Sequence, residues 1–284
     1  MGQRSTNPDT KMYSVKKILL WLLLIAVPSA AYYAITGGAR GQYDYAFFAL
    51  VIAGASVAVE RKRLRQFGLS LDSWSARLCG LAAVLAVVPF VALLVLGLGA
   101  GAIPTARVDA PPAYLIVLTI NFIVSSAIIE EFAMRGIVFQ EMEKWMPRPL
   151  LSIASSLIFV AMHSMNPNIG AIALVNVFLA NILLNIIFFL SRSLLAALAY
   201  HFVWNFSQVL LLGAPLSGNH YEPILYRVSI DQLNPIIFGS EFGFEGGIAC
   251  SFVLIITAAI VAKKVSTSPV VSALIYKEQY GKID

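Results

Sequence analysis

The chain alternates between long apolar segments and short polar connections. A helix needs about 20 mostly apolar residues to cross a hydrocarbon core roughly 30 Å thick. Eight segments approach or exceed that length, at about 15–36, 43–59, 77–99, 113–140, 150–166, 169–190, 194–213 and 246–262. The second and the fifth are short, and the second fits a tilted or interfacial helix as well as a spanning one. The pattern predicts an all-α fold, a polytopic membrane helix bundle of about eight transmembrane helices.

The polar connections divide this pattern into five parts and contain no internal repeat. Residues 1–14 form a polar N-terminus, 15–112 hold the first three spans, and 113–213 hold spans four to seven. Residues 214–245 form the longest connection, whose prolines and glycines indicate a loop with short structured pieces. Residues 246–284 hold the last span and a polar C-terminus.

Composition supports a membrane protein and excludes several other classes. Hydrophobic residues make up 59% of the 284 positions and charged residues only 12%, where a soluble domain has about a quarter. A water-soluble enzyme, a disordered tail and a nucleic-acid-binding protein are therefore excluded, and the expected environment is the lipid bilayer. Cys79 and Cys250 are too few for a disulfide scaffold and are expected to be free thiols. The sequence does not indicate an oligomeric state.

The positions of the basic residues predict the topology, because Lys and Arg concentrate in cytoplasmic connections. One set of connections holds Arg4, Lys11, Lys16, Lys17, Arg61, Lys62, Arg63, Arg65, Arg77, Lys144, Arg148, Arg192, Lys263, Lys264, Lys277 and Lys282. The opposite set holds Arg40, Arg107 and Arg227. The sequence therefore predicts a multi-pass protein of the cell membrane with both termini in the cytoplasm and residues 214–245 outside.

The first span has an alternative interpretation as a cleavable signal peptide. Lys16 and Lys17 precede an apolar stretch, and Pro28, Ser29, Ala30 and Ala31 resemble a cleavage region. The apolar stretch continues to Ile35, which favours an uncleaved helix. Cleavage would leave the orientation of the other seven spans unchanged.

The charged residues inside the spans are the first candidates for function. Apart from histidine, the three that lie clearly within a span rather than near its end are Glu130, Glu131 and Arg135, all on the fourth span. A charge at mid-membrane costs about 2.5–3.5 kcal/mol on insertion scales, so such residues usually face a polar cavity. Glu131 and Arg135 are four residues apart and can form an ion pair. Glu130 points about 100° away around the helix and has no partner nearby in sequence, which suits a general base. A purely structural ion pair is the alternative.

Two histidines lie in other spans. His163 and His201 are in apolar segments, and Asn205 follows His201 by one helical turn; His220 is in the polar loop and is expected to be solvated. Buried polar groups must meet one another or water, so the two histidines and Glu130 are expected to share a cavity. At 1.5 Å per residue the three lie within a band about 10 Å deep. The shorter route to His201 is from the cytoplasm, so an inward-opening polar cavity is expected.

These residues resemble the motifs of the CPBP family of intramembrane proteases, the CAAX-processing, Rce1-type, bacteriocin-processing and Abi-like group. Residues 130–136, EEFAMRG, resemble its EExxxR motif. Residues 159–163, FVAMH, and 201–205, HFVWN, resemble its FxxxH and HxxxN motifs. Each motif is weak alone, but the three occur in order and within 113–213, which the resemblance identifies as the catalytic core.

The resemblance implies a membrane-embedded, glutamate-dependent endopeptidase that acts on a membrane-associated protein or peptide. Glu130 would activate a water molecule with the help of His163, and His201 and Asn205 would form an oxyanion hole. Glu131 and Arg135 would support the site as a structural ion pair. No cofactor is expected. Whether the substrate is lipidated, and where it is cleaved, does not follow from the sequence.

Three alternatives stay open at this point. A zinc-dependent variant could take ligands from Glu130, His163 and His201, although the sequence lacks the His-Glu-x-x-His helix of zinc peptidases. A non-catalytic immunity or scaffold factor could retain the motifs for stability. A proton-coupled transporter could use Glu130 as its carrier, although the paired repeats common in transporters are absent from the sequence.

Overall fold

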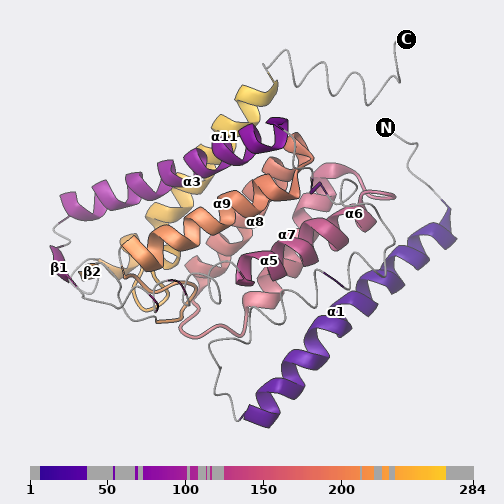
Figure 1. The fold of residues 1–284 in the computed structure, drawn as a ribbon, viewed down its shortest axis with the longest axis horizontal. Coiled ribbons are helices and arrows are strands. Elements are labelled where there is room, and N and C mark those ends of the chain that lie inside the picture. The colour runs from indigo at the N-terminus through magenta and orange to yellow at the C-terminus, as the bar shows by residue number, and fades with distance from the viewer. Residues whose placement is uncertain are drawn as a thin grey trace.

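The computed structural model describes residues 7–36, 54, 68–69, 73–100, 103–107, 113, 116, 125–211, 213–220, 226–229 and 234–266. These residues form a bundle of helices with one small sheet (Figure 1). In chain order the elements are α1 (Pro8–Thr36), α3 (Ser73–Gly99), β1 (Ile103–Arg107), α5 (Ser125–Glu131), η3 (Phe132–Val138), α6 (Phe139–Met142), α7 (Arg148–His163), α8 (Ala171–Ser191), α9 (Leu194–Phe206), η4 (Ser207–Leu211), β2 (Tyr226–Ser229), α10 (Pro235–Phe238), η5 (Phe244–Gly246) and α11 (Ile248–Ser266).

Helix α8 lies between two apolar clusters. The first joins α8 to α3, α9 and α11, and small side chains such as Ala86 of α3 and Ala197 of α9 belong to it. The second joins α8 to η3, α6 and α7 through residues that include Phe139 and Phe188, whose rings make an edge-on contact with centroids 5.4 Å apart. Small residues allow helix backbones to approach closely, as they do in membrane bundles. Residues of α9 belong to the first cluster and residues of η3 to the second, and the two elements also contact each other.

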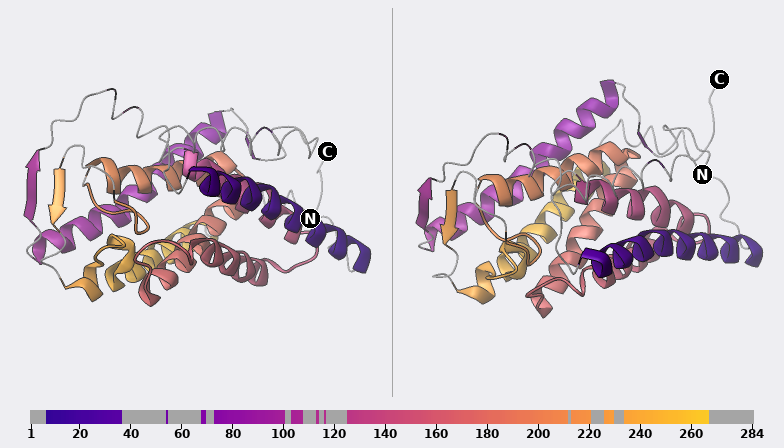
Figure 2. Two further views of the ribbon diagram at one scale, coloured as in Figure 1. Left: turned by 90° about the horizontal axis from the view of Figure 1, so that it is seen from below. Right: turned by 60° about the horizontal axis from the view of Figure 1, so that its bottom comes forward.

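Helix α1 lies at one margin of the bundle, where it packs against α6 and η3 (Figures 1 and 2). The buried carboxylate of Glu141 on α6 binds two side chains of α1 and so stabilises this contact. Ser14 donates a hydrogen bond of 3.3 Å to Oε2 of Glu141, and Lys17 forms an ion pair of 2.9 Å with Oε1. Lys144 pairs with the same carboxylate. Burial opposes ionisation of Glu141, but the hydrogen bonds and charges of Lys144 and Lys17 outweigh it, so the pKa of Glu141 is lowered.

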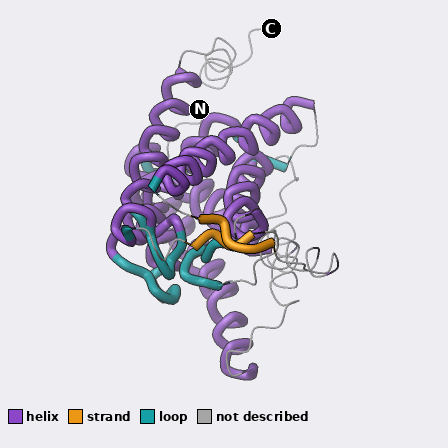
Figure 3. Tube along the Cα trace, turned by 90° about the vertical axis from the view of Figure 1, so that its left-hand side faces the viewer, coloured by secondary structure: helices purple, strands orange, loops and turns teal. Residues whose placement is uncertain are grey.

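A two-stranded antiparallel sheet departs from the all-α expectation. Strand β1 pairs with β2, from Ile103 opposite Ser229 to Arg107 opposite Tyr226, with an irregularity near Thr105 (Figure 3). The strands come from the two connections that the distribution of basic residues places on the same, outer side. Each strand is short and flanked by polar connections, so neither interrupts the apolar periodicity from which the helices were predicted. The fold is mostly helical, but it is not purely so.

The predicted spans correspond to helices wherever they fall on described residues, although the bounds differ. Five long apolar helices, α1, α3, α7, α8 and α11, match expected spans. The expected span 43–59 lies outside the described residues apart from Gly54, as do both chain ends. The expected loop 214–245 holds β2, α10 and the start of η5 among its described parts.

Length and composition alone single out one spanning helix among the residues that the structure describes. This is α8, while Ala76–Pro89, Arg148–His163 and Ile248–Lys263 are apolar but shorter. A core helix of a soluble protein can have the same length and composition, so the multi-pass topology stays a prediction. Cys79 and Cys250 are both free thiols, which confirms that expectation.

Helix α7 ends earlier than the apolar pattern indicates. It stops at His163, and Asn168 adopts a left-handed conformation with φ of 58° in the connection to α8. Gly218 packs against this connection with φ of +81°, and a Cβ atom there would lie 1.8 Å from the carbonyl oxygen of Pro167. Only glycine tolerates that approach. The early end places His163 next to the connections at one end of the bundle rather than deep inside it.

Candidate active site

The acidic pair lies where a regular helix gives way to a wider one. Glu130 and Glu131 end α5, and η3 follows as a π-helical turn that contains Arg135. Such turns occur frequently at functional sites. Nη1 of Arg135 is 3.1 Å from Oε1 of Glu131, and both side chains are fully buried. The ion pair expected from the spacing of four residues is therefore present.

Neighbouring helices complete the environment of Arg135. Nη2 donates to Oδ1 of Asn181 at 2.6 Å and to its carbonyl oxygen at 3.1 Å. Asn181 in turn donates to Oγ of Ser156 at 2.9 Å, and the guanidinium lies 5.8 Å from the ring centre of Phe159. A buried charge is tolerated only when it is paired and hydrogen-bonded. This network fixes η3 against α7 and α8.

His163 is oriented by its own helix. Its Nδ1 lies 2.9 Å from the carbonyl oxygen of Phe159, and the two rings contact with centroids 4.4 Å apart. A carbonyl oxygen only accepts, so Nδ1 carries the proton and donates it. Nε2 is therefore directed away from the backbone of α7, and it lies 3.8 Å from Oε2 of Glu130. The four-residue spacing of the FxxxH motif therefore places the Phe159 carbonyl group where it orients the His163 ring.

His201 is oriented by Glu131. Its Nδ1 lies 2.8 Å from Oε1 of Glu131, the oxygen that also accepts from Arg135. The Glu131 carboxylate only accepts, so Nδ1 of His201 donates to it. Nε2 of the ring then faces Glu130 at 3.7 Å from Oε2. Glu131 is therefore more than the partner of Arg135, because it also sets the orientation of a second ring.

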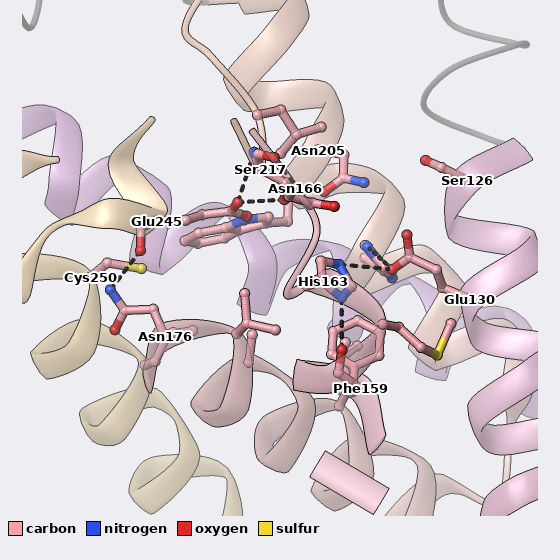
Figure 4. Close-up of a pocket in the computed structure, with 18 of the residues that line it drawn as sticks. Ser126, Glu130, Phe159, His163, Asn166, Asn176, Asn205, Ser217, Glu245 and Cys250 are labelled. Atoms are coloured by element: carbon pink, nitrogen blue, oxygen red, sulfur yellow. Dashed lines mark hydrogen bonds and ion pairs between the residues drawn. The ribbon is translucent and has the colours of Figure 1, made fainter. Parts of the chain in front are cut away.

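One oxygen of Glu130 thus faces both histidines at the wall of a cavity of about 210 Å³ (Figure 4). Asn205, one turn after His201 on α9, lines the same cavity, and so does Ser126. The structure thus brings together the four predicted catalytic residues from three separate predicted spans; they are Glu130, His163, His201 and Asn205. His220, expected in a polar loop, is exposed and pairs with Glu241 at 2.8 Å.

The cavity approaches the end of the bundle opposite to the one expected. Its lining includes Asn166 from the α7–α8 connection and Ser217, Asn219 and Glu245 from the connection between η4 and α11. Within the described part of the chain, no residue of 143–147 or 191–193 lines it. The predicted topology would place these connections outside, but the topology is itself a prediction, so the side of the membrane to which the cavity opens stays a prediction. The early end of α7 and the return of Glu245 into the bundle bring these residues to the cavity.

Several residues of the site were not found by sequence reasoning. Glu245 accepts from Nε1 of Trp204 at 2.8 Å and from the backbone and hydroxyl of Ser217 at 3.2 and 2.8 Å. Asn181 supports Arg135, as described above. The position of Asn181 inside an apolar segment is the feature of the sequence that could have identified it as a residue of the site. No local spacing connects Glu245 with Trp204, which is 41 residues away.

The site contains Glu and His side chains, which are common zinc ligands. Among the residues that the structure describes, no group of three or more His, Cys, Asp or Glu side chains is arranged to hold a metal ion.

The protein is a helical bundle with a glutamate–histidine centre at the wall of a polar cavity. Comparison with protein families identifies the class of protein to which this arrangement corresponds. The family of type II CAAX prenyl endopeptidases, Rce1-like, matches residues 112–207. The match covers about a third of the chain and includes Glu130, Glu131, Arg135, His163, His201 and Asn205. The resemblance to CPBP proteases is thus confirmed for this segment, and the family is one of membrane-embedded hydrolases that cleave peptide bonds. No curated protein matches the chain.

Proposed function

We propose that this protein is an intramembrane endopeptidase in which Glu130 activates a water molecule for attack on a peptide bond. The observation that supports it is the position of one Glu130 oxygen, 3.8 Å from Nε2 of His163 and 3.7 Å from Nε2 of His201 at the cavity wall. These distances exceed a direct hydrogen bond and suit groups bridged by one water molecule. Two rings and a carboxylate that converge in this way can hold a nucleophilic water.

The proposed reaction balances its protons at Glu130. The carboxylate takes a proton from the water as the water oxygen attacks the carbonyl carbon of the substrate, which yields a tetrahedral oxyanion. The protonated Glu130 then gives that proton to the leaving amine as the C–N bond breaks. His163 holds the water through Nε2, since its Nδ1 already donates to Phe159. A positioned acid–base group of this kind contributes about 10²–10⁴-fold to the rate.

His201 and Asn205 would stabilise the oxyanion. They lie one turn apart on α9 and both line the cavity, so their donors can converge on one oxygen. Nδ1 of His201 already donates to Glu131, so a second hydrogen bond from Nε2 requires the doubly protonated ring. Glu131 provides the negative charge that favours this cation, and Arg135 and Asn181 hold Glu131 and the ring in position.

The membrane setting is part of the proposal. Large apolar side chains are exposed on α1, α3 and α11, for example Leu23, Val88 and Phe252, and contiguous apolar surfaces of this kind mark membrane or protein contacts. We propose a multi-pass protein of the cell membrane with both termini in the cytoplasm. Its substrate would be a membrane-associated protein or peptide, which would reach Glu130 without leaving the bilayer surface.

The test compares cells that produce the wild-type protein with cells that produce Glu130→Gln. New protein N-termini should appear in the membrane fraction only with the wild type, and the uncleaved precursor should accumulate with the variant. Equal abundance of the two proteins in the membrane is the necessary control. An identical set of N-termini in both strains would contradict the proposed proteolysis.

A further inference from the structure

Helix α9 is held between two carboxylates. Nδ1 of His201 donates to Glu131 at 2.8 Å. Three residues later, Nε1 of Trp204 donates to Oε1 of Glu245, also at 2.8 Å. Each residue of a helix is turned by about 100° from the one before it, so these two side chains leave α9 about 60° apart. Together the two bonds limit the rotation of α9 about its axis. The proposed reaction uses the bond to Glu131 and gives Glu245 no role.

The carboxylate of Glu245 joins three parts of the chain. Its Oε1 accepts from Trp204 of α9 and, at 3.3 Å, from Nε2 of Gln208 in η4. Its Oε2 accepts from the backbone and the hydroxyl of Ser217 at 3.2 and 2.8 Å. A carboxylate offers about four acceptor positions, and this one uses them on its neighbours in the fold. Glu245 is therefore a group that fixes the wall of the cavity.

The backbone around Glu245 is itself fixed. Asn176 of α8 donates to the carbonyl oxygens of Glu245 and Gly247 at 2.7 and 2.8 Å. Gly243 has φ of +88°, and a Cβ atom there would lie 2.0 Å from the carbonyl oxygen of Pro215. Only glycine tolerates this approach. The segment thus packs closely against its neighbours without the help of the carboxylate, so Glu245 can act as a fixed point for Trp204.

Asn205 depends on this fixed point more than the two histidines do. It follows Trp204 directly, lines the cavity and is only 6% exposed. The rings of His163 and His201 are each oriented by a hydrogen bond at Nδ1. The side chain of Asn205 has no hydrogen-bond partner among the described residues, so the rotation of α9 sets its direction. A displacement of about 1 Å at a reacting centre can cost about 10²-fold in rate.

We propose that Glu245 is a positioning residue that acts through Trp204, because their hydrogen bond sets the rotation of α9 that directs Asn205 toward the oxyanion. This inference rests on the proposed proteolysis. Glu131 positions the first oxyanion donor, His201, and Glu245 positions the second. Figure 4 shows Glu245 on the opposite side of the cavity from Glu130. Glu245 also lies outside residues 112–207, the segment that the family match covers.

The first experiment measures kcat and KM in proteoliposomes. The substrate is an anchored fluorogenic peptide that carries a cleavage site found with the wild type. Glu245→Gln places a donor where both oxygens now accept, and Trp204→Phe removes only the N–H group. Each variant should lower kcat by up to about 10²-fold with little change in KM. If Glu245→Gln does not accumulate in the membrane, Trp204→Phe tests the same bond. Wild-type kcat in these variants would overturn the inference.

Matched controls make the same chemical changes elsewhere. Glu241→Gln alters an exposed carboxylate on the same connection, where it pairs with His220. Trp145→Phe removes an indole N–H group that has no hydrogen-bond partner among the described residues. Both controls should keep the kcat of the wild type. An equal loss of kcat in the controls and in the Glu245 and Trp204 variants would overturn the inference.

The second experiment separates positioning from a general structural role. If Glu245 acts through Asn205, Glu245→Gln should lower kcat in the wild type but by less than about twofold in an Asn205→Ala background. Effects of residues that act as a unit are not additive, whereas independent effects add in free energy. A structural role would lower kcat by the same factor in both backgrounds and would overturn the inference.

A third measurement does not depend on turnover. Labelling with 5-fluorotryptophan gives four fluorine NMR signals, from Trp21, Trp74, Trp145 and Trp204. Trp204→Phe identifies one of them, and Glu245→Gln should shift that signal alone. An unchanged Trp204 signal would overturn the inference. If the Trp204 signal shifts but the wild type cleaves no peptide, the proposed proteolysis fails. If the wild type cleaves and Glu245→Gln has unchanged kcat, only the role of Glu245 fails.

Discussion

Nδ1 of His201 lies 2.8 Å from Oε1 of Glu131, the same oxygen that Arg135 contacts at 3.1 Å. One carboxylate oxygen therefore links the buried cation to the ring that faces Glu130. The two adjacent glutamates have different environments. Glu131 is fully buried and accepts hydrogen bonds from Arg135 and His201, whereas the side chain of Glu130 is 22% exposed at the cavity wall. We therefore expect the two glutamates to have different roles. Glu131 would be a positioning residue, and Glu130 would contact water and substrate.

The first prediction separates these roles by exchanging each carboxylate for an amide. Glu130→Gln should abolish cleavage with thermal stability close to that of the wild type, because glutamine keeps the shape of the side chain and the contacts of Glu130 with the two histidines, at 3.7 and 3.8 Å, are longer than direct hydrogen bonds. Glu131→Gln leaves Arg135 as a buried charge without its counter-ion, a change that typically costs about 3–5 kcal/mol. Thermal unfolding in detergent and a cleavage assay measure the two effects.

The contrast between the variants decides the interpretation. Glu131→Gln should lose stability as well as activity, since His201 also loses its acceptor. If Glu130→Gln still cleaves and both variants are equally destabilised, the acidic pair has only a structural role.

The second prediction concerns the oxyanion. Asn205→Ala should reduce kcat about 10²–10³-fold, the usual cost of removing one oxyanion donor, with a much smaller change in KM. The matched control is Asn234→Ala, which removes the N-cap of α10 and should cost about 1 kcal/mol of stability without a loss of kcat. A large rise in KM with kcat unchanged would assign Asn205 to substrate binding instead.

The sequence predicts the helical bundle well because lipid or core burial forces long apolar segments, which are visible without any tertiary information. It also predicts the Glu131–Arg135 pair, since four residues in a helix bring the two groups together. The strands β1 and β2 could not be predicted in this way. They are short, and their pairing joins residues more than 100 positions apart, from Ile103 to Ser229.

The site was predictable as a set of residues but not as a geometry. His163, His201 and Glu130 could be grouped because each is a buried polar group in need of a partner. The bond between His201 and Glu131 spans 70 residues and depends on how α9 packs against α5. The contact between Glu245 and Trp204 could not be predicted for a related reason, because Glu245 returns from a loop and no periodicity in the sequence records that contact.

The third prediction distinguishes glutamate chemistry from zinc chemistry. Purified protein should contain substoichiometric zinc and should cleave in the presence of EDTA. Asn205 is a poor zinc ligand, so a mechanism in which His201 binds zinc gives Asn205 no direct role. Metal analysis and cleavage are measured on the same sample before and after chelation.

A zinc enzyme would behave differently at each step. Stoichiometric zinc whose removal stops cleavage, and whose return restores it, would move Glu130, His163 and His201 to the role of metal ligands. His201→Ala would then lose metal and activity together.

The last prediction uses the lowered pKa of Glu141 to test how α1 is fastened to the bundle. A carboxyl group whose pKa is lower in the folded than in the unfolded state stabilises the fold above its unfolded pKa, about 4.3 for Glu. That contribution is lost as the pH falls through the folded pKa. Glu141→Gln should therefore lower the melting temperature at pH 7, by an amount equivalent to about 1.5–3 kcal/mol for hydrogen bonds to charged groups. The difference from the wild type should shrink as the pH falls below about 4.

The control is Gln140→Glu, which adds a carboxyl group at the neighbouring position without removing the contacts of Glu141 with Lys17 and Ser14. A melting-temperature difference between Glu141→Gln and the wild type that stays constant from pH 7 to pH 3 would show that the ionised carboxylate does not hold α1 in place.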